Sequence, residues 1–117
     1  MTVTLYGLPT CDTCKKARNW LARHHVAHEF VDYREHPIAP AKLKDYANAV
    51  GGWEKLVNRS SMTWRSLPET RKTPASDPEW TLLIREHPAL GRRPLVVTAD
   101  GDVSVGFTNG SFEKLFA

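Results

Sequence analysis

The only two cysteines of the chain, Cys11 and Cys14, lie three residues apart in the segment GLPTCDTCKKA (7–17). The alternating, strand-forming run Thr2–Tyr6 precedes them, and a helical pattern runs from about residue 12 to residue 25. The letters GLPT interrupt the strand, so Cys11 is predicted at the turn where the helix begins. Any fold for this chain must therefore place a CxxC pair between its first strand and its first helix.

The segment His28–Tyr33 is predicted to form a second strand. Two short strands joined by one helix form a βαβ unit, which implies parallel strands with a right-handed crossover. The middle of the chain is helical, with one helix at about Pro40–Val50 that ends at two glycines. A further helix has Ser76 and Glu79 as a predicted capping box at its start.

The C-terminal part returns to strand-like sequence. The segment PLVVTADGDVSVGF has two strand-forming runs around Asp100–Gly101, which is typical of a hairpin. The segment NGSFEKLFA predicts a last helix with an Asn/Ser cap. The prediction is one α/β domain over residues 1–117, with the order βαβ…ββα and a helical insertion over about residues 38–90.

Length and charge restrict the function classes. The chain has 117 residues, which suits a single domain, and a net charge of +3 with scattered basic residues, which argues against direct nucleic-acid binding. No run approaches the roughly 20 apolar residues of a membrane span, and the N-terminal segment lacks the pattern of a signal peptide. We therefore expect a cytoplasmic, monomeric protein without a membrane partner, in which a CxxC pair serves redox or metal chemistry.

The two cysteines differ in their expected roles. The unpaired N–H groups and the dipole of a helix start stabilise a thiolate, so Cys11 is the predicted nucleophile. Cys14 lies one turn later on the same face and is either a resolving thiol or a small buried apolar residue. A closed zinc site needs four ligands, and the histidines do not show a suitable spacing, so no metal is predicted.

The segment GRRPLVV places Pro94 at the start of the third strand. In a thioredoxin-like arrangement a cis proline lies there beside the reactive cysteine; the alternative is a trans proline that only begins the strand. Arg93 would then approach the Cys11 sulfur and bind an anion. Thr10 and Arg59 are further candidates for anion binding, although surface arginines without a role are common.

Four segments together resemble the ArsC/Spx family of arsenate reductase-related proteins, closest to its YffB-type branch: YGLPTCDTCKKARNWL, DYREHPI, WEKLVNRSSMTWRSL and GRRPLVV…VGF. The resemblance covers essentially the whole chain and implies a thioredoxin-like fold with a helical insertion. It implies that Cys11 is the nucleophile and Arg93 the arginine before the proline. It also implies glutathione as a co-substrate rather than a tightly bound cofactor, with glutaredoxin as a partner.

The chain departs from the reductase pattern at two places. The insertion reads NRS where the family often reads NTR, so Arg59 lies one position early, and the segment DVSVGF lacks the arginine that arsenate reductases carry there. These departures favour general thiol reduction over arsenate reduction. The alternative function is that of the Spx members, which bind the C-terminal domain of the RNA polymerase α subunit and use CxxC as a redox switch.

Overall fold

The first strand, β1 (Val3–Gly7), lies inside a four-stranded sheet in the computed structural model, which describes residues 2–116. The other strands are β2 (His28–Asp32), β3 (Leu95–Val97) and β4 (Val103–Val105). The order across the sheet is β2-β1-β3-β4. β1 and β2 are parallel, with Gly7 opposite Asp32, whereas the β1–β3 and β3–β4 pairs are antiparallel. The parallel βαβ unit and the C-terminal hairpin are thus both present.

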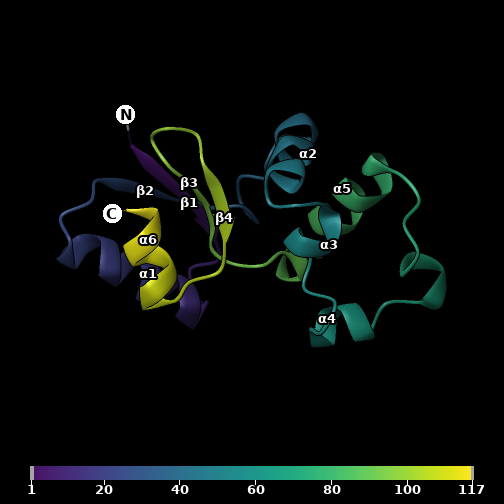
Figure 1. Cartoon of the computed structure of the whole chain (residues 1–117). Helices are drawn as coiled ribbons and strands as arrows, with labels where there is room; N and C mark the ends of the chain where they lie inside the picture. The colour runs from purple at the N-terminus through teal and green to yellow at the C-terminus, as the bar shows by residue number, and fades with distance from the viewer. Residues whose placement is uncertain (1, 117) are drawn as a thin grey trace. The chain divides into compact units, whose positions relative to one another are not determined.

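Two helices, α1 (Asp12–Arg23) and α6 (Asn109–Leu115), pack on one face of this sheet (Figure 1). Apolar residues recur along α1 at helical spacing, and they meet the inward residues of the strands and of α6. The buried cluster consists of Val3, Leu5, Ala17, Trp20, Leu21, Val96 and Phe112. The sheet order with these two helices on one face is the predicted α/β thioredoxin-like fold.

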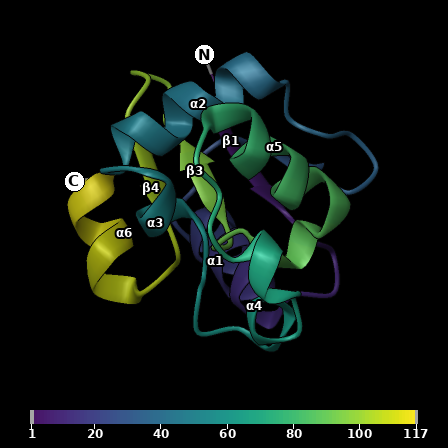
Figure 2. The same cartoon turned by 90° about the vertical axis from the view of Figure 1, so that its right-hand side faces the viewer.

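The chain divides into two compact units. The sheet, α1 and α6 form the first unit, from residues up to 33 and from 93 onward, and residues 34–92 form the second. The second unit is helical (Figure 2), with the elements α2 (Pro40–Ala49), α3 (Trp53–Leu56), α4 (Met62–Arg65), η1 (Glu69–Arg71), α5 (Asp77–Glu86) and η2 (Pro88–Leu90). An isolated bridge between Val57 and Gly91 joins its middle to its C-terminal end.

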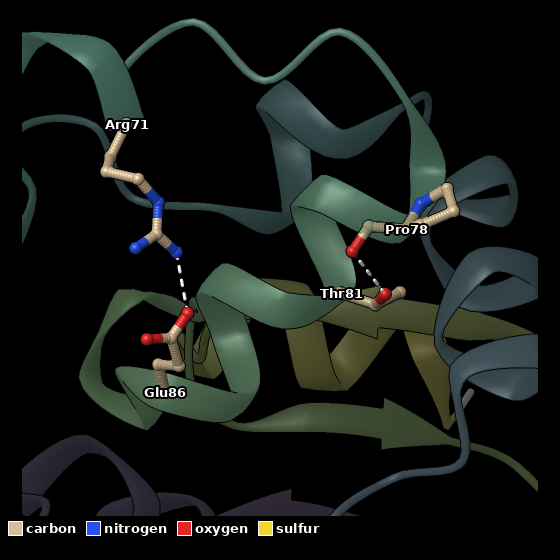
Figure 3. A network of polar contacts seen from close by, with 4 residues as sticks. All are labelled: Arg71, Pro78, Thr81 and Glu86. Atoms are coloured by element: carbon tan, nitrogen blue, oxygen red, sulfur yellow. Dashed lines mark hydrogen bonds and ion pairs between the residues drawn. The ribbon is translucent and has the colours of Figure 1, made fainter.

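Aromatic rings and polar side chains join the short helices of the second unit. The indole of Trp80 is nearly parallel to those of Trp53 and Trp64, with ring centroids 6.1 and 6.0 Å apart. Arg71 donates from Nη2 to Glu86 Oε1 at 2.6 Å, which joins η1 to the end of α5 (Figure 3). Helices of four residues are not stable through their own backbone hydrogen bonds, so these side-chain contacts stabilise them.

Two predicted helix caps are wrong in detail. The N-cap of α6 is Thr108, whose hydroxyl accepts the Ser111 N–H while the Ser111 hydroxyl accepts the Thr108 N–H, both at 3.0 Å. At α5 Ser76 is the N-cap residue, as predicted, but its side chain makes no capping hydrogen bond, and Glu79 accepts the N–H of Ala75 at 2.8 Å. Several hydroxyl and carboxylate groups lie near each helix start, and the sequence does not decide which of them bonds the free N–H groups.

Among the residues that the structure describes, no helix is both long and apolar enough to cross a membrane.

Candidate active site

The turn between β1 and α1 positions both cysteines. The strand ends at Gly7, the N–H of Cys11 donates to the Leu8 carbonyl at 3.1 Å, and Cys11 is the N-cap residue of α1. Its backbone is extended, and its carbonyl accepts the N–H of Lys15 at 3.1 Å, which begins the helix. Cys14 follows one turn later on the buried stripe. Both cysteines are free thiols, with Cys11 half-buried and Cys14 buried.

The surroundings of Cys11 favour its thiolate. Burial raises the pKa of Cys11, but four other contacts outweigh burial and hold this pKa below the ordinary value of a cysteine. These contacts are the N–H and the thiol of Cys14, the positive charge of Arg93 and the N–H of Thr13. Two of the four are backbone donors of the first helical turn, which are free because no earlier carbonyl pairs with them. The Cys11 sulfur is therefore both ionisable and accessible.

Cys14 has the opposite character. Burial is the largest influence and raises the pKa of Cys14 to about 11, although the N–H of Leu8 and the charge of Arg93 lower it. The hydrogen bond to Cys11 and the charge on Cys11 raise it further. Because the thiolate of Cys11 forms first, Cys14 remains a thiol and donates its S–H to the Cys11 sulfur. The two cysteines thus form an asymmetric pair of thiolate and donor.

A glycine opposite Cys14 makes room for its sulfur. A Cβ atom at Gly7 would lie 2.5 Å from Cys14 Sγ and 3.2 Å from the Phe30 ring. The first distance is shorter than real Cβ contacts allow, so only glycine fits while Cys14 keeps this position. Gly7 therefore controls how closely α1 approaches the end of β1.

Arg93 and Pro94 lie at the start of β3, next to the cysteines. The Arg93–Pro94 peptide bond is cis, and Pro94 is fully buried. The positive charge of Arg93 acts on both sulfurs and on the hydroxyl of Tyr33, lowering the pKa of each group. Tyr33 is buried, with 7% of its surface exposed. The structure therefore brings together Cys11, Cys14, Arg93 and Pro94 from the predicted set, and adds Gly7 and Tyr33.

The remaining candidates are Thr10 and Arg59. Thr10 is exposed in the turn before α1. Arg59 belongs to the second unit, where it is exposed and its Nη2 lies 3.9 Å from Glu54 Oε2. No group of three or more His, Cys, Asp or Glu side chains suited to a metal ion occurs in residues 2–116. The residues gathered around Cys11 all belong to the first unit.

Tyr33 and Gly7 were not predicted as site residues. A signal for both exists in the βαβ pattern, because the carboxyl ends of parallel strands meet at one edge of a sheet, where sites form. Gly7 ends the first strand and Tyr33 directly follows the second. Other polar residues surround Tyr33 in the sequence, so the pattern alone does not single it out.

Comparisons with known proteins agree with this fold. The model of the ArsC family matches residues 6–115. Among solved structures, the YFFB protein superimposes with a TM-score of 0.86 at 33% identity, covering 99% of this chain and 100% of that one. An arsenate reductase (ArsC) related protein from Brucella melitensis gives a TM-score of 0.74 at 35% identity, with 99% and 95% covered.

A regulator is also among the relatives. The global transcriptional regulator Spx of Bacillus subtilis is 30% identical over 114 residues, which span 96% of this chain and 85% of the regulator. The resemblance inferred from the CxxC turn, the insertion and the Arg93–Pro94 segment thus agrees with the family model and with relatives along almost the full length. The chain belongs to the ArsC family.

Proposed function

We propose that this protein is a thiol–disulfide oxidoreductase that uses Cys11 as its nucleophile and glutathione as its co-substrate. The observation that carries the proposal is the asymmetry of the pair: the pKa of Cys11 is lowered while burial raises the pKa of Cys14 to about 11. The thiolate is the reactive form of cysteine, so only Cys11 is prepared to attack at neutral pH.

The reaction proceeds in three thiol–disulfide exchanges. The Cys11 thiolate attacks one sulfur of a substrate disulfide, which forms a mixed disulfide and releases the other sulfur as a thiolate that takes up a proton. A glutathione thiolate then attacks the substrate-bound Cys11 sulfur, which releases the second substrate thiol, and a second glutathione regenerates Cys11. The substrate disulfide gains two electrons, and two glutathione molecules are oxidised to their disulfide.

Arg93 has two functions in this scheme. Its positive charge stabilises the Cys11 thiolate before attack and again when the thiolate is regenerated. Its guanidinium also presents donors suited to a carboxylate, such as those of glutathione, or to an oxyanion. Arsenate would use the same thiolate, but the early position of Arg59 and the missing arginine after the hairpin favour disulfide substrates.

The experiment compares Cys11→Ser with Cys14→Ser in a glutathione-coupled assay on a small disulfide. Cys11→Ser is expected to lose turnover, since no thiolate remains at the helix start. Cys14→Ser is expected to keep glutathione-dependent turnover at a lower rate, because it loses only the S–H donor. Full turnover by Cys11→Ser would refute the proposal. An inactive Cys14→Ser protein that accumulates a Cys11–glutathione adduct by mass spectrometry would make Cys14 the resolving thiol instead.

The rival function is a redox-switched regulator that binds the RNA polymerase α subunit. The observation in its favour is the Spx relative, which aligns with 96% of this chain. A pull-down with the C-terminal domain of the α subunit, with the Cys11–Cys14 pair oxidised and reduced, separates the two functions. Binding in one redox state only, without turnover, would favour the regulator, and no binding in either state would remove it.

A further inference from the structure

A groove of about 530 Å³ lies between α1 and the start of α6. Both helices belong to the first unit and pack on the same face of the sheet (Figure 1). The groove is lined by Lys16, Asn19, Ala22, Arg23, Phe107 and Asn109. Neither cysteine is among these residues, nor is Arg93, so the groove is distinct from the candidate active site.

One wall of the groove comes from α1. Its four lining residues recur at helical spacing and are all exposed, so they share one outward face of the helix. Lys16 and Arg23 are seven positions apart, which separates them by about 10 Å along the helix axis. Asn19 and Ala22 lie between them. This wall therefore has a positive charge at each end and an amide and a methyl group in the middle.

Phe107 and Asn109 form the other wall. The half-buried Phe107 ring packs edge-to-face on Phe112, with ring centroids 4.7 Å apart. Because Phe112 is only 1% exposed, this contact fixes the Phe107 ring and leaves its remaining surface to line the groove. The Asn109 amide can both donate and accept hydrogen bonds. The groove thus combines two charges, two amides and one fixed aromatic surface.

The two cations of the groove have no acidic partner within residues 2–116. The ion pairs of that range involve neither Lys16 nor Arg23. Asp12 and Glu113, the acidic residues of α1 and α6, are exposed and form no ion pair with them. A groove with two unpaired positive charges and no carboxylate in its lining is complementary to an anionic ligand.

The openness of the groove restricts the class of ligand. Its lining residues are exposed except for the half-buried Phe107, whereas a small organic anion needs a pocket that covers most of its surface. Nucleic acid is held through many phosphate contacts, and only two cations line this groove. A peptide matches the spacing of those cations, because carboxylates three residues apart in an extended chain are also separated by about 10 Å.

We propose that this groove docks an acidic segment of a partner protein, in which carboxylates bind Lys16 and Arg23 and an apolar side chain between them covers Phe107. Docking at this groove needs neither cysteine. The proposal therefore goes beyond the proposed function and can be tested whether or not the protein reduces disulfides.

The first test titrates the reduced, ¹⁵N-labelled chain with the peptide EELFEELF and follows its NMR signals. The control peptide, QQLFQQLF, keeps the apolar residues and removes the side-chain charges. We expect the acidic peptide to shift the amide signals of the outward face of α1 and of Phe107 and Asn109, less strongly in high salt, and the control peptide to bind more weakly. Equal binding of the two peptides, shifts centred on other elements, or no shift at millimolar peptide would each refute the proposal.

Substitution of the two cations separates docking from general charge attraction. The double variant Lys16→Gln, Arg23→Gln should bind EELFEELF about fivefold more weakly, since it loses both charge contacts. The double variant Lys42→Gln, Arg85→Gln lowers the net charge equally, at exposed positions of α2 and α5, and should bind as wild type does. All four side chains are exposed, and circular dichroism checks that both variants fold. An equal loss of affinity in both variants would overturn the proposal.

A carboxylate placed inside the groove tests the role of charge directly. Ala22→Glu should weaken binding of EELFEELF more than Ala22→Gln, which adds a side chain of the same size without charge. Equal losses would mean that size rather than charge controls binding, against the proposal. A single-stranded DNA oligonucleotide that shifts the same signals at lower concentration than the peptide would assign the groove to phosphates and would also overturn it.

Discussion

The two compact units of the chain use polar groups in different ways. In the first unit, buried groups with shifted pKa values, Cys14 and Tyr33, lie with Cys11 and Arg93 at one edge of the sheet. In the second unit, the ion pairs join partly exposed side chains, such as those of Arg71 and Glu86, which are 36% and 43% exposed. Burial strengthens electrostatic effects, so the charge of Arg93 acts more strongly on the buried groups of the first unit than it would at a fully exposed site.

The apolar packing of the units differs as well. Phe112 in the first unit is 1% exposed and makes edge-to-face contacts with Trp20 and Phe107, at centroid distances of 5.4 and 4.7 Å. In the second unit, the middle ring of the three parallel indoles, Trp80, is only half-buried. We therefore expect replacement of an aromatic residue by alanine to lower the free energy of unfolding by different amounts in the two clusters.

The largest expected effect is that of Phe112→Ala. Removing a fully buried ring leaves a cavity in the cluster that supports α1, and we expect a loss of about 3–5 kcal/mol in the free energy of unfolding. Urea unfolding followed by circular dichroism measures it. Trp80→Ala is the comparison in the second unit and should lose less, because its ring is partly in solvent. If Trp80→Ala lost as much free energy of unfolding as Phe112→Ala, or more, the two aromatic clusters would not differ in the way proposed.

Much of the first unit could be predicted because its sequence signals are strong. Alternation along the first strand, and the helical spacing of Cys14, Ala17 and Leu21, each favour one kind of element. The position of Cys11 at the helix start followed directly, since it lies between the two patterns. The helix caps were harder to predict, because Ser76 and Thr108 lie among other groups that can bond a free N–H.

The roles of Tyr33 and Gly7 depend on contacts between residues far apart in the sequence, which local sequence patterns do not predict. The effect of the Arg93 charge on Tyr33 joins residues far apart in the chain, which come together only once the sheet has formed. The need for glycine at position 7 depends on the sulfur of Cys14, in the first turn of α1. Both depend on how the strands and α1 pack together, whereas the position of Cys11 at the helix start depends only on the local sequence.

The second expected effect concerns this packing. In Gly7→Ala the new Cβ would lie 2.5 Å from Cys14 Sγ, so the sulfur must move, at a loss of about 1–3 kcal/mol in the free energy of unfolding. Displacing the Cys14 thiol weakens a hydrogen bond that lowers the pKa of Cys11, so alkylation of Cys11 should require a higher pH. Urea unfolding and the pH profile of alkylation measure the two effects.

Gly110 provides the matched control for this substitution. It lies in α6, and an added Cβ atom there would have nothing within 4 Å, so Gly110→Ala should leave stability unchanged or raise it by up to about 1 kcal/mol. If Gly7→Ala were as stable as Gly110→Ala and kept the wild-type alkylation profile, the close approach of Cys14 to β1 would not matter for the site.

The smallest expected effect belongs to the second unit. The Trp53 Nε1–H donates to Asp77 Oδ1 at 2.7 Å, and Lys44 Nζ lies 3.4 Å from Oδ2. The hydrogen bond from Trp53, together with Lys44, lowers the pKa of Asp77 below its ordinary value despite an opposing effect of burial. The ionised carboxylate thus stabilises the folded state above the pKa of unfolded aspartate, about 3.9, and this stability is lost as pH falls through the lower folded value.

Thermal unfolding of wild type and Asp77→Asn at about pH 6 and about pH 3 measures this contribution. The wild type should lose more of its melting temperature on acidification than Asp77→Asn does, and Asp45→Asn, an exposed change on α2, should behave as wild type. Because Asp77 lies at the surface, the difference should also shrink in high salt, unlike the alkylation profile of Cys11, whose partners are partly buried. If the Asp77 effect did not change with salt, the charges of the second unit would be as protected from screening as those around Cys11. The difference between the two units would then be wrong.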